Sequence, residues 1–127
     1  MRYLVLCSSL AFPAPVFAQR LAVPVIEPAG QGQGPSCGAA VVQGLREAEG
    51  GYLAIRTGPG TRFAQIGALR NGDQVWLVSR HGDWAGIAVQ GGGTSPSDLC
   101  ANPGQARKIT GPDVGWVHGR WLRDGAR

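Results

Sequence analysis

Three cysteines and two histidines are the side chains of this 127-residue chain that are best suited to covalent or metal chemistry. A cysteine nucleophile needs a thiolate beside a histidine, so Cys37 or Cys100 would react with His81 or His118 as its partner. Zinc ligands usually come in close pairs such as Cys-x-x-Cys, and the sequence has no such pair. We therefore expect no metal, no cofactor and no catalysis, with a cysteine-dependent enzyme as the weaker alternative.

The first eighteen residues have the pattern of an export signal. One positive charge follows the initiating methionine, residues 3–17 are nearly all apolar or small, and small side chains precede Gln19 where signal peptidase cuts. The apolar stretch is shorter than the roughly 20 residues of a membrane span. We expect cleavage between Ala18 and Gln19, no membrane span, and a periplasmic or secreted product. A lipid anchor at Cys7 is disfavoured, because Leu6 stands where a small residue is needed.

Removal of that signal would leave two cysteines, Cys37 and Cys100. Exported proteins meet an oxidising compartment, so these two most simply form one disulfide. The bond would close a loop of about 63 residues, for which the chain-entropy model gives roughly 4 kcal/mol. Two free buried thiols are the alternative, and titration of thiols in the denatured protein distinguishes the two states.

Composition indicates a small domain rich in turns. The chain has 21 glycines and 9 prolines without a period of three, and 43% of its residues are hydrophobic. So many glycines disfavour helices, because each interior glycine costs about 1 kcal/mol relative to alanine. The net charge is +4, and the arginines are scattered singly instead of forming the basic patch that nucleic acids require. We expect a mostly β domain that does not bind nucleic acid.

Periodicity divides the chain into a spacer and one domain. Residues 19–38 combine prolines with Gly-Gln repeats, which predicts a flexible spacer. Residues 39–127 form the predicted domain, in which 91–112, rich in Gly, Ser and Pro, is a long inserted loop. Short alternating segments between glycine turns predict an all-β, small, partly open barrel of five to six strands. The predicted strands are 39–45 at an edge, 53–56, 66–69, 75–78, 84–89 and 115–118, with 120–122 closing the domain.

Two motifs carry a family resemblance. Residues 53–60 read Leu-Ala-Ile-Arg-Thr-Gly-Pro-Gly, which resembles a leading Leu-x-Val-Arg-x-Gly-Pro-Gly motif. Residues 115–117, Gly-Trp-Val, and the later Trp121-Leu122 are similar to a closing Gly-Trp-Val…Tyr-Leu. From Gly51 to Arg123 the chain therefore resembles a bacterial SH3 domain of the SH3b type. The inserted loop departs from the family, which usually has a short turn there.

The resemblance implies an SH3-like barrel that binds instead of catalysing, with peptidoglycan or another cell-envelope component as its partner. The alternative is an accessory domain whose edge strand or Trp-bearing face docks on one envelope protein. In the family, the positions of Trp84 and Trp116 are mostly core or half-buried. Arg56 occupies a motif position and has two interpretations, a ligand contact or a bond to carbonyl groups of the adjacent turn.

Aromatic rings beside arginines are the candidate binding residues. An exposed ring stacks on sugars or peptide planes, and a neighbouring guanidinium adds cation–π attraction. A guanidinium also holds a carboxylate by two parallel hydrogen bonds. The predicted ligand-binding residues are Tyr52, Arg56, Arg62, Phe63, Trp76 and Trp121.

Overall fold

The computed structural model describes residues 21–29, 37–47, 50–92, 99–100 and 104–124. The predicted signal and its cleavage between Ala18 and Gln19 lie outside the described residues. Within the described ranges, no helix has the length and apolar character needed to cross a membrane.

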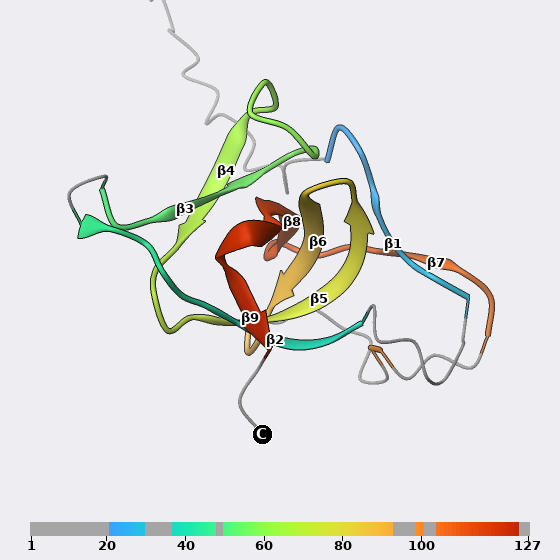
Figure 1. The fold of residues 1–127 in the computed structure, drawn as a ribbon. Coiled ribbons are helices and arrows are strands. Elements are labelled where there is room, and N and C mark those ends of the chain that lie inside the picture. The colour runs from blue at the N-terminus through green and yellow to red at the C-terminus, as the bar shows by residue number, and fades with distance from the viewer. Residues whose placement is uncertain (1–20, 30–36, 48–49, 93–98, 101–103, 125–127) are drawn as a thin grey trace, which may run out of the picture.

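The described chain is built from β-strands and a short 3-10 helix, which confirms the predicted all-β class (Figure 1). The elements in chain order are β1 (Val25–Glu27), β2 (Gly38–Val42), β3 (Leu53–Arg56), β4 (Gln65–Leu69), β5 (Gln74–His81), β6 (Trp84–Val89), β7 (Arg107–Ile109), β8 (Val114–His118), the 3-10 helix η2 (Gly119–Trp121) and β9 (Leu122–Asp124).

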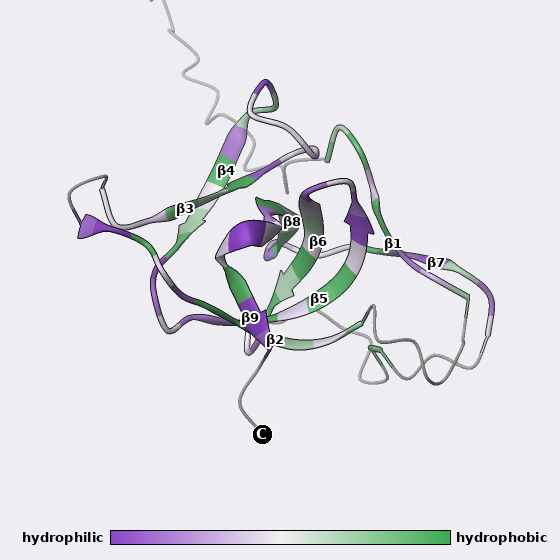
Figure 2. Cartoon of the chain, in the orientation of Figure 1, coloured by the Kyte–Doolittle hydropathy of each residue, from purple (hydrophilic) through white to green (hydrophobic). Residues whose placement is uncertain are grey.

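Seven of these strands form one antiparallel sheet in the order β4-β3-β8-β6-β5-β2-β9. The sheet curls around itself, because every one of its strands contributes at least one side chain to a single buried cluster. Figure 2 shows hydrophobic residues along these strands. In β3, for example, Leu53 and Ile55 are buried in this core, while Ala54 and Arg56 are only half-buried. The core cluster consists of Ala40, Val42, Leu53, Ile55, Leu69, Val75, Leu77, Ala85, Ile87, Val117 and Leu122.

The strand predicted for residues 39–45 is not at an edge. In the structure β2 pairs with β5 on one side and with β9 on the other. The edges of the described sheet are β4 and β9. The difference arises because residues 122–124 continue as a strand after η2, so the sheet has seven strands instead of five to six.

A two-stranded ribbon joins the predicted spacer to the predicted insertion. β1 pairs antiparallel with β7, with Val25 opposite Ile109 and Glu27 opposite Arg107. In Figure 1 the two strands run side by side next to the barrel. The structure thus differs from the sequence-based prediction at residues 25–27, which belong to the packed domain and not to a flexible spacer. The inserted segment 91–112 likewise contains a strand.

The ribbon covers the outer face of the barrel wall. Along β5, Val75 and Leu77 belong to the barrel core. Val78 belongs to a second buried cluster, and Trp76 packs against that cluster. The ribbon supplies two buried side chains of that cluster, Val25 and Ile109. We call this set the outer cluster; its buried members are Val25, Val78, Ala88, Ile109, Val114 and Trp116. The barrel wall is therefore packed on both faces at β5, β6 and β8.

The close approach of β8 and β3 requires a glycine at position 115. A Cβ placed on Gly115 would lie 2.4 Å from Cγ2 of Ile55 and 3.1 Å from the carbonyl oxygen of Arg56. We expect Gly115→Ala to lower the free energy of unfolding by about 1–3 kcal/mol, because overpacking forces the backbone or Ile55 to move. Urea denaturation followed by tryptophan fluorescence measures the change.

Gly38→Ala is the matched control for this substitution. A Cβ on Gly38 meets nothing within 4 Å, so its effect should stay within about 0.5 kcal/mol. Equal losses in the two variants would show that the contact with Ile55 is not what makes position 115 sensitive.

Candidate binding site

Tyr52 and Trp121 lie at the same surface pocket, although they are far apart in the sequence. The pocket has a volume of about 170 Å³ and is lined by Leu45, Arg46, Gly51, Tyr52 and Trp121. Tyr52 is 46% exposed. Trp121 is half-buried and packs one part of its ring system against the barrel core. We call this the Tyr52–Trp121 pocket.

A tight turn before β3 positions Tyr52. The Gly51 N–H donates to the carbonyl of Arg46, and the Gly50 N–H donates to that of Glu47. Gly50 and Gly51 both have positive φ, +97° and +67°, which glycine adopts without steric cost. A Cβ on Gly50 would lie 3.0 Å from Cε1 of Tyr52. The turn therefore brings Arg46 to the same pocket as Tyr52. The tyrosine ring lies against Gly50 of this turn.

The segment after β2 positions Trp121 and Leu45. The backbone carbonyl of Trp121 accepts a hydrogen bond of 2.9 Å from the N–H of Gln43. Gly44, with φ +90°, a conformation that favours glycine, lies against the indole of Trp121, where a Cβ would be 3.4 Å from Cε3. The Asn71 side chain bonds both the N–H and the carbonyl of Leu45, each at 3.0 Å. The pocket wall is thus held by hydrogen bonds from two other parts of the fold.

Two exposed arginines give the pocket a positive rim. Arg46 lines it, and the guanidinium carbon of Arg120 lies 4.9 Å from the centroid of the Trp121 ring. Within the residues that the structure describes, neither rim arginine is paired with a carboxylate. Two rings and two guanidinium groups suit a ligand that offers a flat face for stacking and an anionic group.

Three of the other predicted residues gather at the turn between β3 and β4. Arg56 donates from Nη1 to the carbonyl of Phe63 at 2.9 Å, so this arginine holds the turn. The Phe63 ring covers Gly58, where a Cβ would lie 2.6 Å from Cδ1 of the ring. Arg62 lies above the same ring, with its guanidinium carbon 4.8 Å from the centroid. None of the three lines the Tyr52–Trp121 pocket.

The remaining tryptophans lie on the outer face of the barrel wall. Trp76 is half-buried against the outer cluster instead of standing free. Trp116 is 3% exposed, and its Nε1 donates to the carbonyl of Val23 at 2.8 Å. Trp84 is half-buried and packs edge to face against the His118 ring, with the two ring centroids 5.4 Å apart. The hydrogen bond from Trp116 to Val23 ties the N-terminal segment to the barrel.

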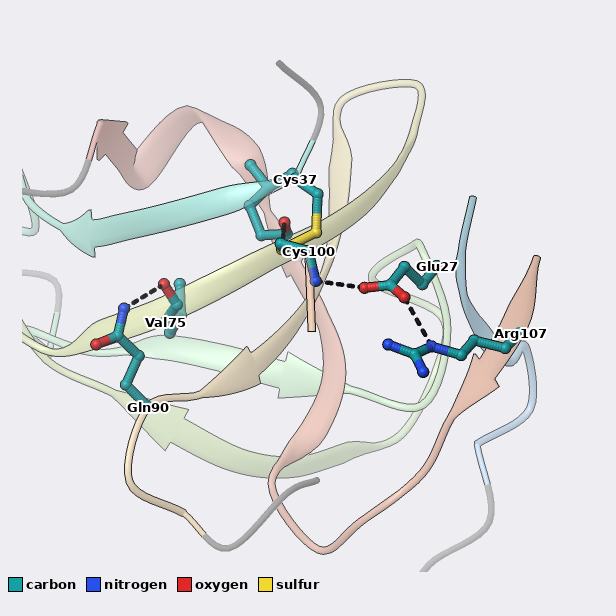
Figure 3. The surroundings of a disulfide bond; sticks show 7 residues. Glu27, Cys37, Val75, Gln90, Cys100 and Arg107 are labelled. Carbon is teal, nitrogen blue, oxygen red and sulfur yellow. Dashed lines mark hydrogen bonds and ion pairs between the residues drawn. A yellow bond between two sulfur atoms is a disulfide. The ribbon is translucent and has the colours of Figure 1, made fainter. Parts of the chain in front are cut away.

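The predicted disulfide between Cys37 and Cys100 is present, with Cα atoms 5.2 Å apart (Figure 3). In this form neither sulfur is a thiolate, so the nucleophile of the cysteine-enzyme alternative is not available. The sequence also contains one Gly-x-Ser-x-Gly pentapeptide, at 34–38. Its last glycine begins β2, whereas the serine turn of hydrolases leads from a strand into a helix.

Sequence reasoning missed the two arginines of the rim. Neither Arg46, just after the predicted strand 39–45, nor Arg120, beside Trp121, is among the predicted ligand-binding residues. A usable signal was present for Arg46, because the Gly50-Gly51 pair predicts a reversal that returns the chain toward Tyr52. For Arg120 the signal was its place next to Trp121, but only the fold shows which ring it covers.

The comparisons with known proteins agree with the barrel. Residues 51–123, more than half of the chain, match the family model described as bacterial SH3 domain. No curated protein and no solved structure matches the chain.

Proposed function

The chain belongs to the bacterial SH3 domain family, and on this premise we propose that it is an exported, non-catalytic binding module. Its ligand is peptidoglycan or another anionic component of the cell envelope, and the Tyr52–Trp121 pocket is the binding site. The observation that carries the proposal is the pocket itself, which is lined by two aromatic rings and Arg46, with Arg120 over the Trp121 ring. Within the described residues neither guanidinium pairs with a carboxylate.

The chemistry of peptidoglycan complements that of the pocket. The polymer carries sugar rings and amide planes, which stack on aromatic side chains, and free carboxylates, which pair with arginine. Stacking on Trp121 and Tyr52 would hold the flat group, while Arg46 and Arg120 hold the carboxylate. The net charge of +4 would also attract an anionic polymer over a longer distance.

Export is the second part of the proposal. The N-terminal sequence pattern supports it, and so does the disulfide, because such bonds persist in oxidising compartments outside the cytoplasm. Envelope polymers are the ligands that a protein in this location meets.

Co-sedimentation with purified peptidoglycan at low salt tests the proposal. We expect the wild-type protein to pellet and Trp121→Ala or Tyr52→Ala to bind at least about tenfold more weakly, since buried aromatic contacts dominate binding energy. Arg46→Gln and Arg120→Gln should weaken binding less and reduce its dependence on salt. Because Trp121 also packs on the core, tryptophan fluorescence must show that each variant remains folded.

Arg62→Gln is the matched control, because Arg62 also lies over an aromatic ring but outside the pocket. Its binding should equal that of the wild type. A loss as large as that of Arg120→Gln would contradict the pocket as the site. If the wild-type protein does not pellet at low salt, peptidoglycan is ruled out, and the alternative of one envelope protein as partner is favoured.

A further inference from the structure

A buried carboxylate lies beside the disulfide. Glu27 is 2% exposed, and its Oε1 accepts a hydrogen bond from Nε of Arg107 at 2.7 Å. Its Oε2 accepts the N–H of Cys100, as Figure 3 shows. Cys100 has φ +68°, an uncommon conformation for a residue other than glycine, and this hydrogen bond holds it there. Glu27 therefore turns one oxygen toward the cysteine and the other toward the arginine.

The three side chains form a compact set of possible metal ligands. A carboxylate oxygen of Glu27 and the sulfur atoms of Cys37 and Cys100 all lie within 4.8 Å of one another. Glu27 is buried, whereas both cysteines are half-buried. The ligands come from β1, from the residue before β2 and from the turn at 99–100, and none belongs to the Tyr52–Trp121 pocket.

We propose that reduction of the disulfide converts this set into a zinc site with two thiolate ligands and one carboxylate ligand. A dithiol reductant supplies two electrons and two protons, which break the S–S bond and leave two thiols, while the reductant becomes a disulfide. Binding of one Zn²⁺ then releases the two thiol protons and forms two Zn–S bonds. Oε2 of Glu27 leaves the N–H of Cys100 and becomes the third ligand.

The dimensions fit tetrahedral zinc. With Zn–S bonds of about 2.3 Å, two thiolates on one ion lie about 3.8 Å apart, and a carboxylate oxygen binds at about 2.0–2.2 Å. Cα atoms 5.2 Å apart allow this separation by side-chain rotation alone. Arg107 continues to hold Oε1, which orients the carboxylate as outer partners of metal ligands do. Three protein ligands leave the fourth position open to solvent or a substrate.

Charge and ligand type favour zinc over other common divalent ions. Two thiolates and one carboxylate carry three negative charges, and Arg107 supplies one positive charge, so a divalent cation neutralises the set. Soft sulfur ligands select zinc over magnesium and calcium, which prefer oxygen. The bound ion would replace the covalent link between Cys37 and Cys100, so the N-terminal segment and the inserted segment remain joined after reduction.

Zinc titration of the reduced protein tests the site. The purified protein is reduced with a dithiol, freed of reductant without air, and titrated with Zn²⁺ against a chromophoric chelator. We expect one ion per chain, and Co²⁺ in place of Zn²⁺ should give the sulfur-to-metal charge-transfer absorption of two thiolates. The oxidised protein should show neither effect.

Substitution at Glu27 distinguishes the proposed site from cysteines that bind zinc by themselves. Loss of an outer partner already costs about 10–100-fold in metal affinity, so Glu27→Gln should cost at least about tenfold. Glu47→Gln, at an exposed acidic position, is the matched control and should bind as the wild type does. Wild-type affinity in Glu27→Gln would contradict the role of the carboxylate.

Alkylation of the reduced thiols gives a control that needs no substitution. The alkylated wild-type chain keeps Glu27 and every other side chain but has no sulfur ligand to offer. Equal zinc binding by the alkylated and the free-thiol forms would overturn the proposal, as would binding of equal strength by the oxidised protein. If Glu27→Gln does not fold, the comparison of these three wild-type forms still decides whether the thiolates bind the metal.

Discussion

Replacement of both Cys37 and Cys100 by serine is expected to lower the free energy of unfolding by about 4 kcal/mol. The bond closes a loop with a sequence separation of 63, and the chain-entropy model gives about 3 kcal/mol for 15 residues and 4.7 kcal/mol for 100. In this model the bond stabilises the fold by restricting the unfolded chain, because it limits how far that chain can expand. Urea denaturation of the oxidised wild type and of the double variant, followed by tryptophan fluorescence, measures the difference.

The disulfide also anchors a segment with little core of its own. Sγ of Cys100 lies 3.7 Å from the carbonyl oxygen of Leu77 in β5, so the bond ties residues 99–100 to the barrel wall. Reduced wild-type protein, kept in a metal chelator, should unfold at the same urea concentration as the double serine variant. A stability loss below about 1 kcal/mol would contradict the chain-entropy account, because the bond would then restrict the unfolded chain too little to stabilise the fold.

Ile109→Ala is expected to lower the free energy of unfolding by about 3 kcal/mol. Ile109 is 1% exposed and packs in the outer cluster, and the replacement of a buried isoleucine by alanine costs about 2–5 kcal/mol. The cost combines the lost burial with the cavity that remains. The same denaturation experiment measures it, and a flexible inserted loop would give no such effect.

Ile26→Ala is the matched control on the same two-stranded ribbon. Ile26 is 38% exposed, and its partner across the ribbon is Lys108. We expect the free energy of unfolding to fall by less than about 1 kcal/mol. The Ile26 side chain is already partly in contact with water, so its truncation removes less buried apolar surface than truncation of Ile109 does. Similar losses for the two isoleucines would contradict the packing of the ribbon against the barrel wall.

The barrel strands were predictable because their signals are local. Residues 53–56 and 84–89 form strands with the predicted bounds. In β3 the alternation of large apolar and other side chains predicts which residues face the core. Glycine turns such as the one at Gly72, with φ +95°, mark where the chain reverses. Both signals arise from residues only a few positions apart, so they can be recognised in the sequence.

The binding pocket was only partly predictable. Composition and spacing selected Tyr52 and Trp121 together with four other residues, but gave no reason to join these two. Their meeting depends on the turn at Gly50-Gly51 and on η2, which approach each other only when the sheet curls. The rim arginines, Arg46 and Arg120, gain their place from the same two turns.

Sequence patterns were enough to predict the β class, the barrel strands, the family and the pairing of Cys37 with Cys100. Only the folded chain reveals that β1 and β7 form a ribbon and that Glu27 is buried against Cys100 and Arg107. The two kinds of feature differ in how far along the chain their interactions reach. Strands of three residues have no measurable period, and their stability comes from hydrogen bonds and burial against partners some eighty residues away.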